Sequence, residues 1–148
     1  MMRASPSERT RSMAYEALDF YDINSLLTDE ERMIRDAVRD WVDENVIPNI
    51  EKACRDGIFP DQWRVDLGEM GVLGAPLEGY GCPGLSYIAY GLICQELERG
   101  DSGVRSFASV QGSLAMYPIW DFGSEEQKNH YLPKMHAGEW IGCFGLTE

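Results

Sequence analysis

The sequence predicts an all-α domain that leads into the start of a β-domain at its carboxyl end. Apolar residues recur at helical spacing through most of the chain, and capping-box patterns mark helix starts at Thr28 and Ser124. A stretch rich in glycine and proline over 74–84 separates two helical segments. An apolar, strand-compatible stretch closes the chain. We therefore expect a flexible tail over 1–14, a helical domain over 15–139 and the first strand of a β-domain over 140–148.

Composition fits one folded domain and restricts its partners. The chain has 148 residues, of which 44% are hydrophobic, so it is long enough and apolar enough to bury a core. Its net charge of -12 argues against binding to nucleic acid, because phosphate contacts need clustered lysine and arginine. The same charge gives no support for binding to an anionic membrane. No apolar run approaches the ~20 residues of a membrane-spanning helix.

The first fourteen residues differ from the rest of the chain. They contain three arginines and one acidic residue. A flexible tail is the favoured interpretation. A short organellar targeting segment is the alternative, because such segments bear arginine and serine and contain few acids. Whether translation starts at Met1 or Met13 stays open.

The first half of the chain predicts two main helices. One begins after Thr28, whose hydroxyl pairs with the carboxylate of Glu31 in a capping box. Pro48 should kink or end this helix near Val46, after which apolar spacing indicates that helical structure resumes. A second helix is expected over 61–70. The segment 74–84 is expected to be a loop and a structural turn, and not a phosphate loop.

The second half predicts further helices. A third helix is expected over 86–99, and its inward positions are Ile88, Leu92, Ile93 and Leu97. The segment 105–120 is nearly uncharged and apolar all round, which is typical of a buried helix. The last helix begins after Ser124, where Gln127 completes the second capping box. Pro133 is expected to divide it.

Cysteine and histidine give no sign of a metal centre. The four cysteines form no C-x-x-C pair, and only His130 and His136 are available as nitrogen ligands. We expect free thiols in a reducing compartment in preference to two disulfides, and histidines that are exposed to solvent. No nucleophile stands beside a paired base, so acyl-enzyme chemistry has no support.

Arg105 is the first candidate for a functional residue. A guanidinium in an otherwise uncharged helix is costly to desolvate unless it is paired. Its partner is either structural, namely Glu98 or Asp101, or a carboxylate of a ligand held by the planar fork. The residues by themselves leave both alternatives open.

Several motifs together carry a family resemblance. They are DFYDINSLLTDEERMIRD, GYGCPGLSYIAYGLICQELERGDSGVRSF, YPIWDFGSEEQ and IGCFGLTE. With them, residues 19–148 resemble the N-terminal part of acyl-CoA dehydrogenases, most closely the glutaryl-CoA dehydrogenase branch. This resemblance implies that Arg105 and Ser106 bind the distal carboxylate of the substrate. It places Glu98 near the same pocket.

The resemblance also implies that FAD is the cofactor. The final CFGLTE is similar to the start of the family's flavin-contacting segment. The residues concerned are Phe144, Gly145, Leu146, Thr147 and Glu148. Thr147 would present its hydroxyl and its N–H to the edge of the flavin. Taken without the resemblance, the motif also fits an ordinary buried strand.

The resemblance implies a function for a longer enzyme. The general base is expected beyond Glu148, so no catalytic residue is assigned, and a chain that ended there should be inactive. The implied partners are an acyl-CoA substrate, an electron-transfer flavoprotein and identical subunits in a homotetramer. The expected location is the cytoplasm, or the mitochondrial matrix in a eukaryote. The alternatives are a dehydrogenase for another acyl-CoA and a non-catalytic helical binding module.

Overall fold

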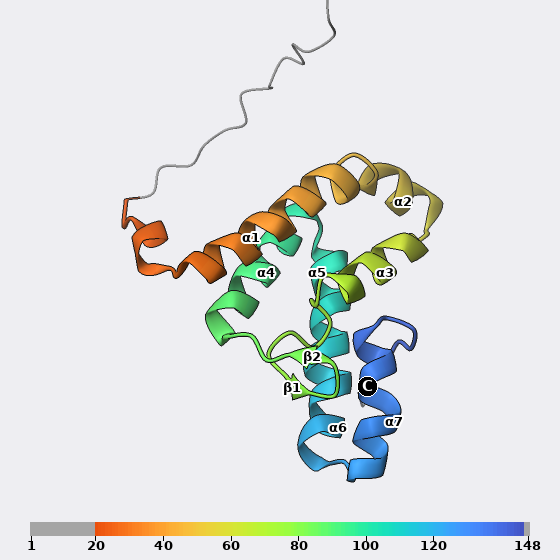
Figure 1. The fold of residues 1–148 in the computed structure, drawn as a ribbon. Coiled ribbons are helices and arrows are strands. Elements are labelled where there is room, and N and C mark those ends of the chain that lie inside the picture. Colours follow the sequence, from red (N-terminus) through yellow and green to blue (C-terminus); the bar gives the residue numbers. More distant parts are fainter. Residues whose placement is uncertain (1–19, 147–148) are drawn as a thin grey trace, which may run out of the picture.

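The computed structural model describes residues 20–146 as a helical assembly with one small hairpin. In chain order the elements are the 3-10 helix η1 (Ile23–Leu26), α1 (Asp29–Trp41), the π-helix η2 (Val42–Val46), α2 (Ile50–Asp56), α3 (Asp61–Glu69), β1 (Glu78–Gly79), β2 (Cys82–Pro83), α4 (Tyr87–Gly100), α5 (Ser102–Ser109), the π-helix η3 (Val110–Met116), α6 (Tyr117–Phe122) and α7 (Glu125–His136). Figure 1 shows α4 beside α1, and α7 alongside the run that continues from α5 into α6. Within residues 20–146, no helix has the length and apolar character needed to cross a membrane.

Both predicted capping boxes are confirmed. Thr28 N donates to Glu31 Oε2 at 3.0 Å, and Glu31 N donates to the Thr28 hydroxyl at 3.2 Å. Ser124 and Gln127 make the same reciprocal pair at the start of α7. These bonds satisfy N–H groups that the first turn of a helix leaves without a partner. The predicted interruption before Pro48 is also present, because η2 ends at Val46 and α2 begins at Ile50.

The core has two parts. The larger part lies among α1, η2, α3, α4 and α5, and its fully buried members include Val42, Leu67 and Leu97. The smaller part lies where the hairpin and α7 pack on η3, around Met116 and Leu132. The run from α5 to η3 therefore contributes to both parts, and it also carries Arg105.

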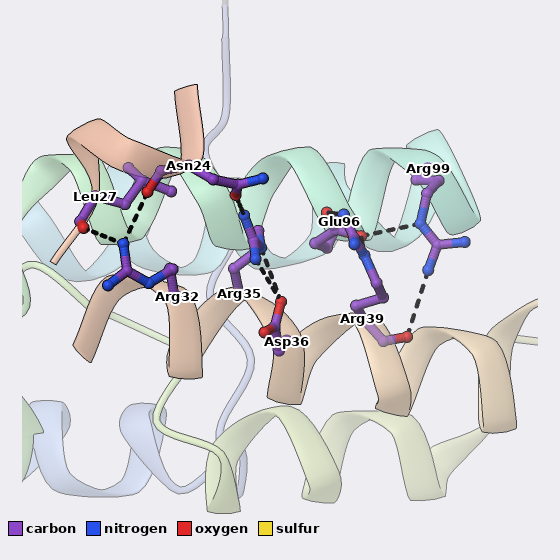
Figure 2. Close-up of polar contacts among 8 residues, drawn as sticks. All are labelled: Asn24, Leu27, Arg32, Arg35, Asp36, Arg39, Glu96 and Arg99. Carbon is purple, nitrogen blue, oxygen red and sulfur yellow. Dashed lines mark hydrogen bonds and ion pairs between the residues drawn. The ribbon is translucent and has the colours of Figure 1, made fainter. Parts of the chain in front are cut away.

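A buried carboxylate joins α1 to α4. Glu96 is fully buried, and Figure 2 shows it between Arg39 of α1 and Arg99 of its own helix. Arg39 Nη2 lies 2.7 Å from Glu96 Oε1, and Arg99 Nε lies 2.9 Å from Glu96 Oε2. Arg99 also pairs with Asp43 at 2.8 Å. Two guanidinium partners compensate a charge that would otherwise be costly to bury.

Several expectations about the elements are wrong. Pro133 does not divide α7, because it lies on the exposed side between the buried Leu132 and Met135, and water can hydrate the carbonyl that it leaves without a donor. The run from 105 to 120 is not buried all round, since Leu114 is 44% exposed. Ile88 points outward and is 57% exposed.

Two further differences concern strands. The predicted loop over 74–84 contains the short antiparallel hairpin β1–β2, with Gly79 paired to Cys82. No strand forms over residues 140–146, because a strand needs a neighbour to pair with and the described chain offers none there. The assignment of 140–148 to a β-domain therefore stays a prediction. The expected tail over 1–14 lies outside the described residues.

Candidate functional site

Arg105 lies in the first turns of α5, where local capping fixes the helix start. Asp101 caps the helix, and its Oδ1 accepts hydrogen bonds from Gly103 N at 2.8 Å and Val104 N at 3.1 Å. Val104 and Ala108 turn into the core. Arg105 consequently lies at the edge of α5, with 36% of its side chain exposed.

The guanidinium of Arg105 is held on two of its nitrogens. Nε donates to Glu98 Oε2 at 2.7 Å, and Nη1 donates to the Ser109 hydroxyl at 3.2 Å. The Ser109 hydroxyl in turn donates to the carbonyl of Ser106 at 3.1 Å. The hydrogen bond between Arg105 and Glu98 lowers the pKa of Glu98 and raises the pKa of Arg105. Of the two structural partners considered for Arg105, Glu98 is the one in contact, while Asp101 caps α5.

The third nitrogen of this guanidinium differs from the other two. Nη2 of Arg105 has no acceptor among residues 20–146, and the ion pair with Glu98 is only half-covered. The half-buried Ser106 follows directly on the same helix. Of the three predicted substrate residues, Glu98 and Arg105 are in direct contact, and Ser106 is the next residue along α5. An incoming carboxylate could bind at Nη2 without first displacing Glu98.

A row of polar residues between α4 and α5–η3 extends from this cluster, and we call it the polar seam. Its members are Tyr90, Cys94 and Glu98 on α4, and Arg105, Ser109 and Ser113 on the facing run. The hydroxyls of Tyr90 and Ser113 lie 3.1 Å apart. Burial raises the pKa of Tyr90 and of Cys94. Sequence reasoning missed the seam, although the spacing of four residues on both helices was a usable signal.

The predicted flavin segment is open to solvent. Phe144 is 51% exposed and Leu146 is 78% exposed, and a side chain added at Gly145 would meet nothing within 4 Å. Thr147 and Glu148 lie outside the described residues. Exposed apolar side chains around an open backbone suit an apolar ring system that would cover them. The described part of the segment, Phe144 to Leu146, thus leaves room for a flavin and offers it apolar contact.

The structure also places the four cysteines and the two histidines. All four cysteines are free thiols. His136 is part-buried, and its Nδ1 lies 2.7 Å from the carbonyl oxygen of Leu73, so the expectation of an exposed ring is wrong for this residue. His130 is exposed and packs edge-on against Trp140. In the part of the chain that the structure describes, no group of three or more candidate ligands could hold a metal ion.

Comparison with known proteins identifies relatives of this chain. The acyl-CoA dehydrogenase N-terminal domain matches residues 28–139. YngJ of Bacillus subtilis, a probable acyl-CoA dehydrogenase, is 37% identical over 129 residues, which make up 85% of this chain and 33% of YngJ. Two structures of glutaryl-CoA dehydrogenase from Mycobacterium smegmatis are also similar. One, in complex with FADH2, is 52% identical with a TM-score of 0.83, and the similarity covers 86% of this chain and 33% of that one. The other is 57% identical with a TM-score of 0.81, over 85% and 33%. This chain thus spans about a third of the length of the proteins it matches.

Proposed function

The chain belongs to the acyl-CoA dehydrogenase family through its N-terminal domain, and from that premise we propose that it acts within an FAD-dependent dehydrogenase of a dicarboxylic acyl-CoA. The proposed reaction is the α,β-dehydrogenation of glutaryl-CoA or a similar thioester, with decarboxylation as a possible following step. The observation that carries the proposal is the Arg105 side chain, which is 36% exposed and is held by Glu98 and Ser109, while its Nη2 has no acceptor in the described chain. Identity of 52% and 57% to two glutaryl-CoA dehydrogenases supports the choice of substrate.

In this proposal Arg105 binds the distal carboxylate of the substrate. The chain has a net charge of -12, so a local cation is needed to hold an anionic group against the field of the protein. Glu98 fixes Nε and Ser109 fixes Nη1, which leaves the guanidinium oriented before the substrate arrives. The Ser106 hydroxyl donates a second hydrogen bond to the same carboxylate.

Residues 144–148 would contact the cofactor. Phe144 and Leu146 supply apolar contact, and Thr147 supplies its hydroxyl and N–H as donors. A flavin held there would supply the acceptor for the hydride that leaves the β-carbon of the substrate. The base that removes the α-proton is not assigned to any residue of this chain and is expected beyond Glu148.

We base the proposed partners and location on the same family membership. We propose that an electron-transfer flavoprotein takes the electrons onward and that the enzyme is a homotetramer. The proposed location is the cytoplasm, or the mitochondrial matrix in a eukaryote. Intact mass spectrometry of the native polypeptide tests whether this domain belongs to a longer chain, as its one-third coverage of its relatives suggests.

One experiment tests the function and its nearest rivals. The native protein is purified, its flavin absorption is recorded, and glutaryl-CoA or butyryl-CoA is added under anaerobic conditions. Rapid bleaching of the flavin by glutaryl-CoA and slow bleaching by butyryl-CoA would support the proposal. Equal bleaching by both would make Arg105 a structural residue of another acyl-CoA dehydrogenase, a reading that its ion pair with Glu98 also fits. A native protein without flavin would contradict a dehydrogenase altogether.

A further inference from the structure

Gln111 is a neutral polar residue in the core. Its side-chain hydrogen bonds all go to residues 135–142. It lies in η3 and is 1% exposed. Its amide nitrogen donates to the carbonyl of Met135 at 2.9 Å and to the carbonyl of Trp140 at 2.8 Å. Its Oε1 accepts from Gly142 N at 2.8 Å. The side chain thus joins η3 to the end of α7 and to the residues that follow it.

The contact with Gly142 stands alone in its part of the chain. Residues 141–146 have no regular secondary structure, and in the described part of the chain their one hydrogen bond is the bond from Gly142 N to Gln111. That bond lies two residues before Phe144. The path of the chain toward Phe144 therefore depends on a single buried amide and on packing.

Packing at Gly142 provides an independent observation. A Cβ at this position would lie 2.4 Å from the Cβ of Ala115 in η3 and 2.8 Å from the Cε of Met135. Gly142 therefore lets the segment lie directly against η3. The hydrogen bond to Gln111 and the close contact with Ala115 both hold Gly142 against η3.

The helix that receives this segment also carries the proposed substrate site. Arg105 and Ser109 lie in α5, and the helix continues without a break into η3, where Gln111 lies (Figure 1). The seven residues of η3 form a π-helix, a rare geometry that is frequent at functional sites. The continuous run from α5 to η3 thus carries Arg105 and also contacts the segment that leads to Phe144.

We infer that Gln111 is a positioning residue, which sets Phe144 to Leu146 at a fixed place relative to Arg105. This inference rests on the proposed function, because it takes Phe144 to Leu146 as flavin contacts. An apolar side chain would fill the same space without the desolvation cost of an amide. A glutamine at this position instead fixes two carbonyls and one N–H at defined positions.

The test uses the complete native polypeptide and a matched pair of variants. Gln111→Glu keeps the size of the side chain and removes the amide NH2 that donates both hydrogen bonds, and a protonated carboxyl could replace only one of them. Glu96→Gln makes the opposite exchange at a buried site among α1 and α4, with no contact to residues 139–146 in the described chain. For each protein we would measure the Kd for FAD by fluorescence, the flavin absorption spectrum and the thermal midpoint.

We expect the two variants to differ in their affinity for FAD. Gln111→Glu should raise the Kd for FAD at least about tenfold and shift the flavin spectrum, because at least one of the Met135 and Trp140 carbonyls loses its donor. Glu96→Gln should lower the thermal midpoint and leave the Kd unchanged. If both variants weaken FAD binding only as far as they lower the thermal midpoint, Gln111 has no positioning role. A wild-type protein that binds no flavin would instead refute the proposed function itself.

A second pair keeps the test decisive if Gln111→Glu does not fold. Gly142→Ala should push the segment off η3 and weaken FAD binding, because its new Cβ collides with Ala115. Adding Ala115→Gly removes that collision and leaves only the flexible end of Met135 close to the new Cβ, which can move aside. The double variant should therefore restore the Kd, while the extra glycine in a helix keeps the thermal midpoint low. If FAD binding is unaffected by Gly142→Ala, or stays weak in the double variant, the position of the segment does not govern flavin binding.

Discussion

Arg39 Nη2 donates to Glu96 Oε1 at 2.7 Å, across 57 residues of sequence, and thereby joins α1 to α4 through a carboxylate that has no exposed surface. Burial is the largest single influence on Glu96 and disfavours its charge. The hydrogen bonds and charges of Arg39 and Arg99 together outweigh it, so the pKa of Glu96 is lowered. The stability of the pair of helices therefore depends on keeping both arginines in place.

Removing Arg39 should destabilise the fold. In Arg39→Gln, Glu96 keeps Arg99 but loses its partner on the other helix, which leaves a buried charge only half-compensated. We expect a loss of about 2 kcal/mol in the free energy of unfolding, less than for a fully buried pair because Arg39 is 43% exposed. Urea unfolding at pH 7 measures it. An unchanged midpoint would show that Arg99 alone suffices.

The same carboxylate predicts how stability changes with pH. The pKa of Glu96 in the folded state is below 4.5, the ordinary value that applies to the unfolded chain. Its stabilising contribution is therefore complete above pH 4.5 and is lost as the pH falls through the folded pKa. Urea unfolding between pH 7 and pH 3 should show this loss in the wild type. Glu96→Gln should lose less stability over that range, although Glu31 and Glu98, whose pKa values are also lowered, still contribute.

Two glycines in helices should respond oppositely to alanine. At Gly68 in α3 a Cβ would lie 2.6 Å from the backbone oxygen of Ala137, just after α7, so Gly68→Ala must push the two helices apart. We expect a loss of about 2 kcal/mol. At Gly91 in α4 nothing lies within 4 Å, so Gly91→Ala should stabilise by roughly 0.5–1 kcal/mol through helix propensity. Equal urea midpoints for the two variants would contradict the close contact.

Two cysteines should differ in reactivity. Cys54 is exposed, whereas Cys82 is buried and its burial raises the pKa of the thiol to about 11. Only the thiolate reacts with a maleimide or disulfide reagent, so Cys54 should be labelled and Cys82 should stay unmodified in the folded protein at pH 7.5. Peptide mass spectrometry after timed labelling reads out both sites. Rapid labelling of Cys82 would show that the hairpin opens under native conditions.

Local sequence signals predicted where helices begin. Packing between distant parts of the chain decides the features that the sequence did not predict. Thr28 and Glu31 satisfy each other within one turn, so their capping box is visible in the sequence. The continuity of α7 through Pro133 depends on the burial of the residues around it, which no local rule contains. A strand after Trp140 requires a neighbouring strand.

The candidate site likewise contains residues that the sequence predicted and one that it did not. Arg105 and Glu98 were identified from the motif they share, and their contact is present. The role of Gln111 was not visible, because its partners lie 24 to 31 residues further along the chain. A glutamine in an apolar segment gives no sign of which backbone groups it will meet after folding.

Substitution of Arg105 separates a ligand role of this residue from a structural one. Arg105→Gln removes the charge, so the KM for glutaryl-CoA should rise by roughly 10- to 100-fold, while the KM for butyryl-CoA should change less than about threefold. Arg105→Lys keeps the charge but loses the planar fork, so it should restore only part of the difference. Steady-state kinetics of the complete enzyme with both substrates gives the comparison, and Arg55→Gln is the matched control because Arg55 makes an exposed ion pair with Glu51 in α2. An equal loss with both substrates would mean that Arg105 serves mainly to hold Glu98 between α4 and α5, since removal of a purely structural arginine has no reason to discriminate between acyl chains.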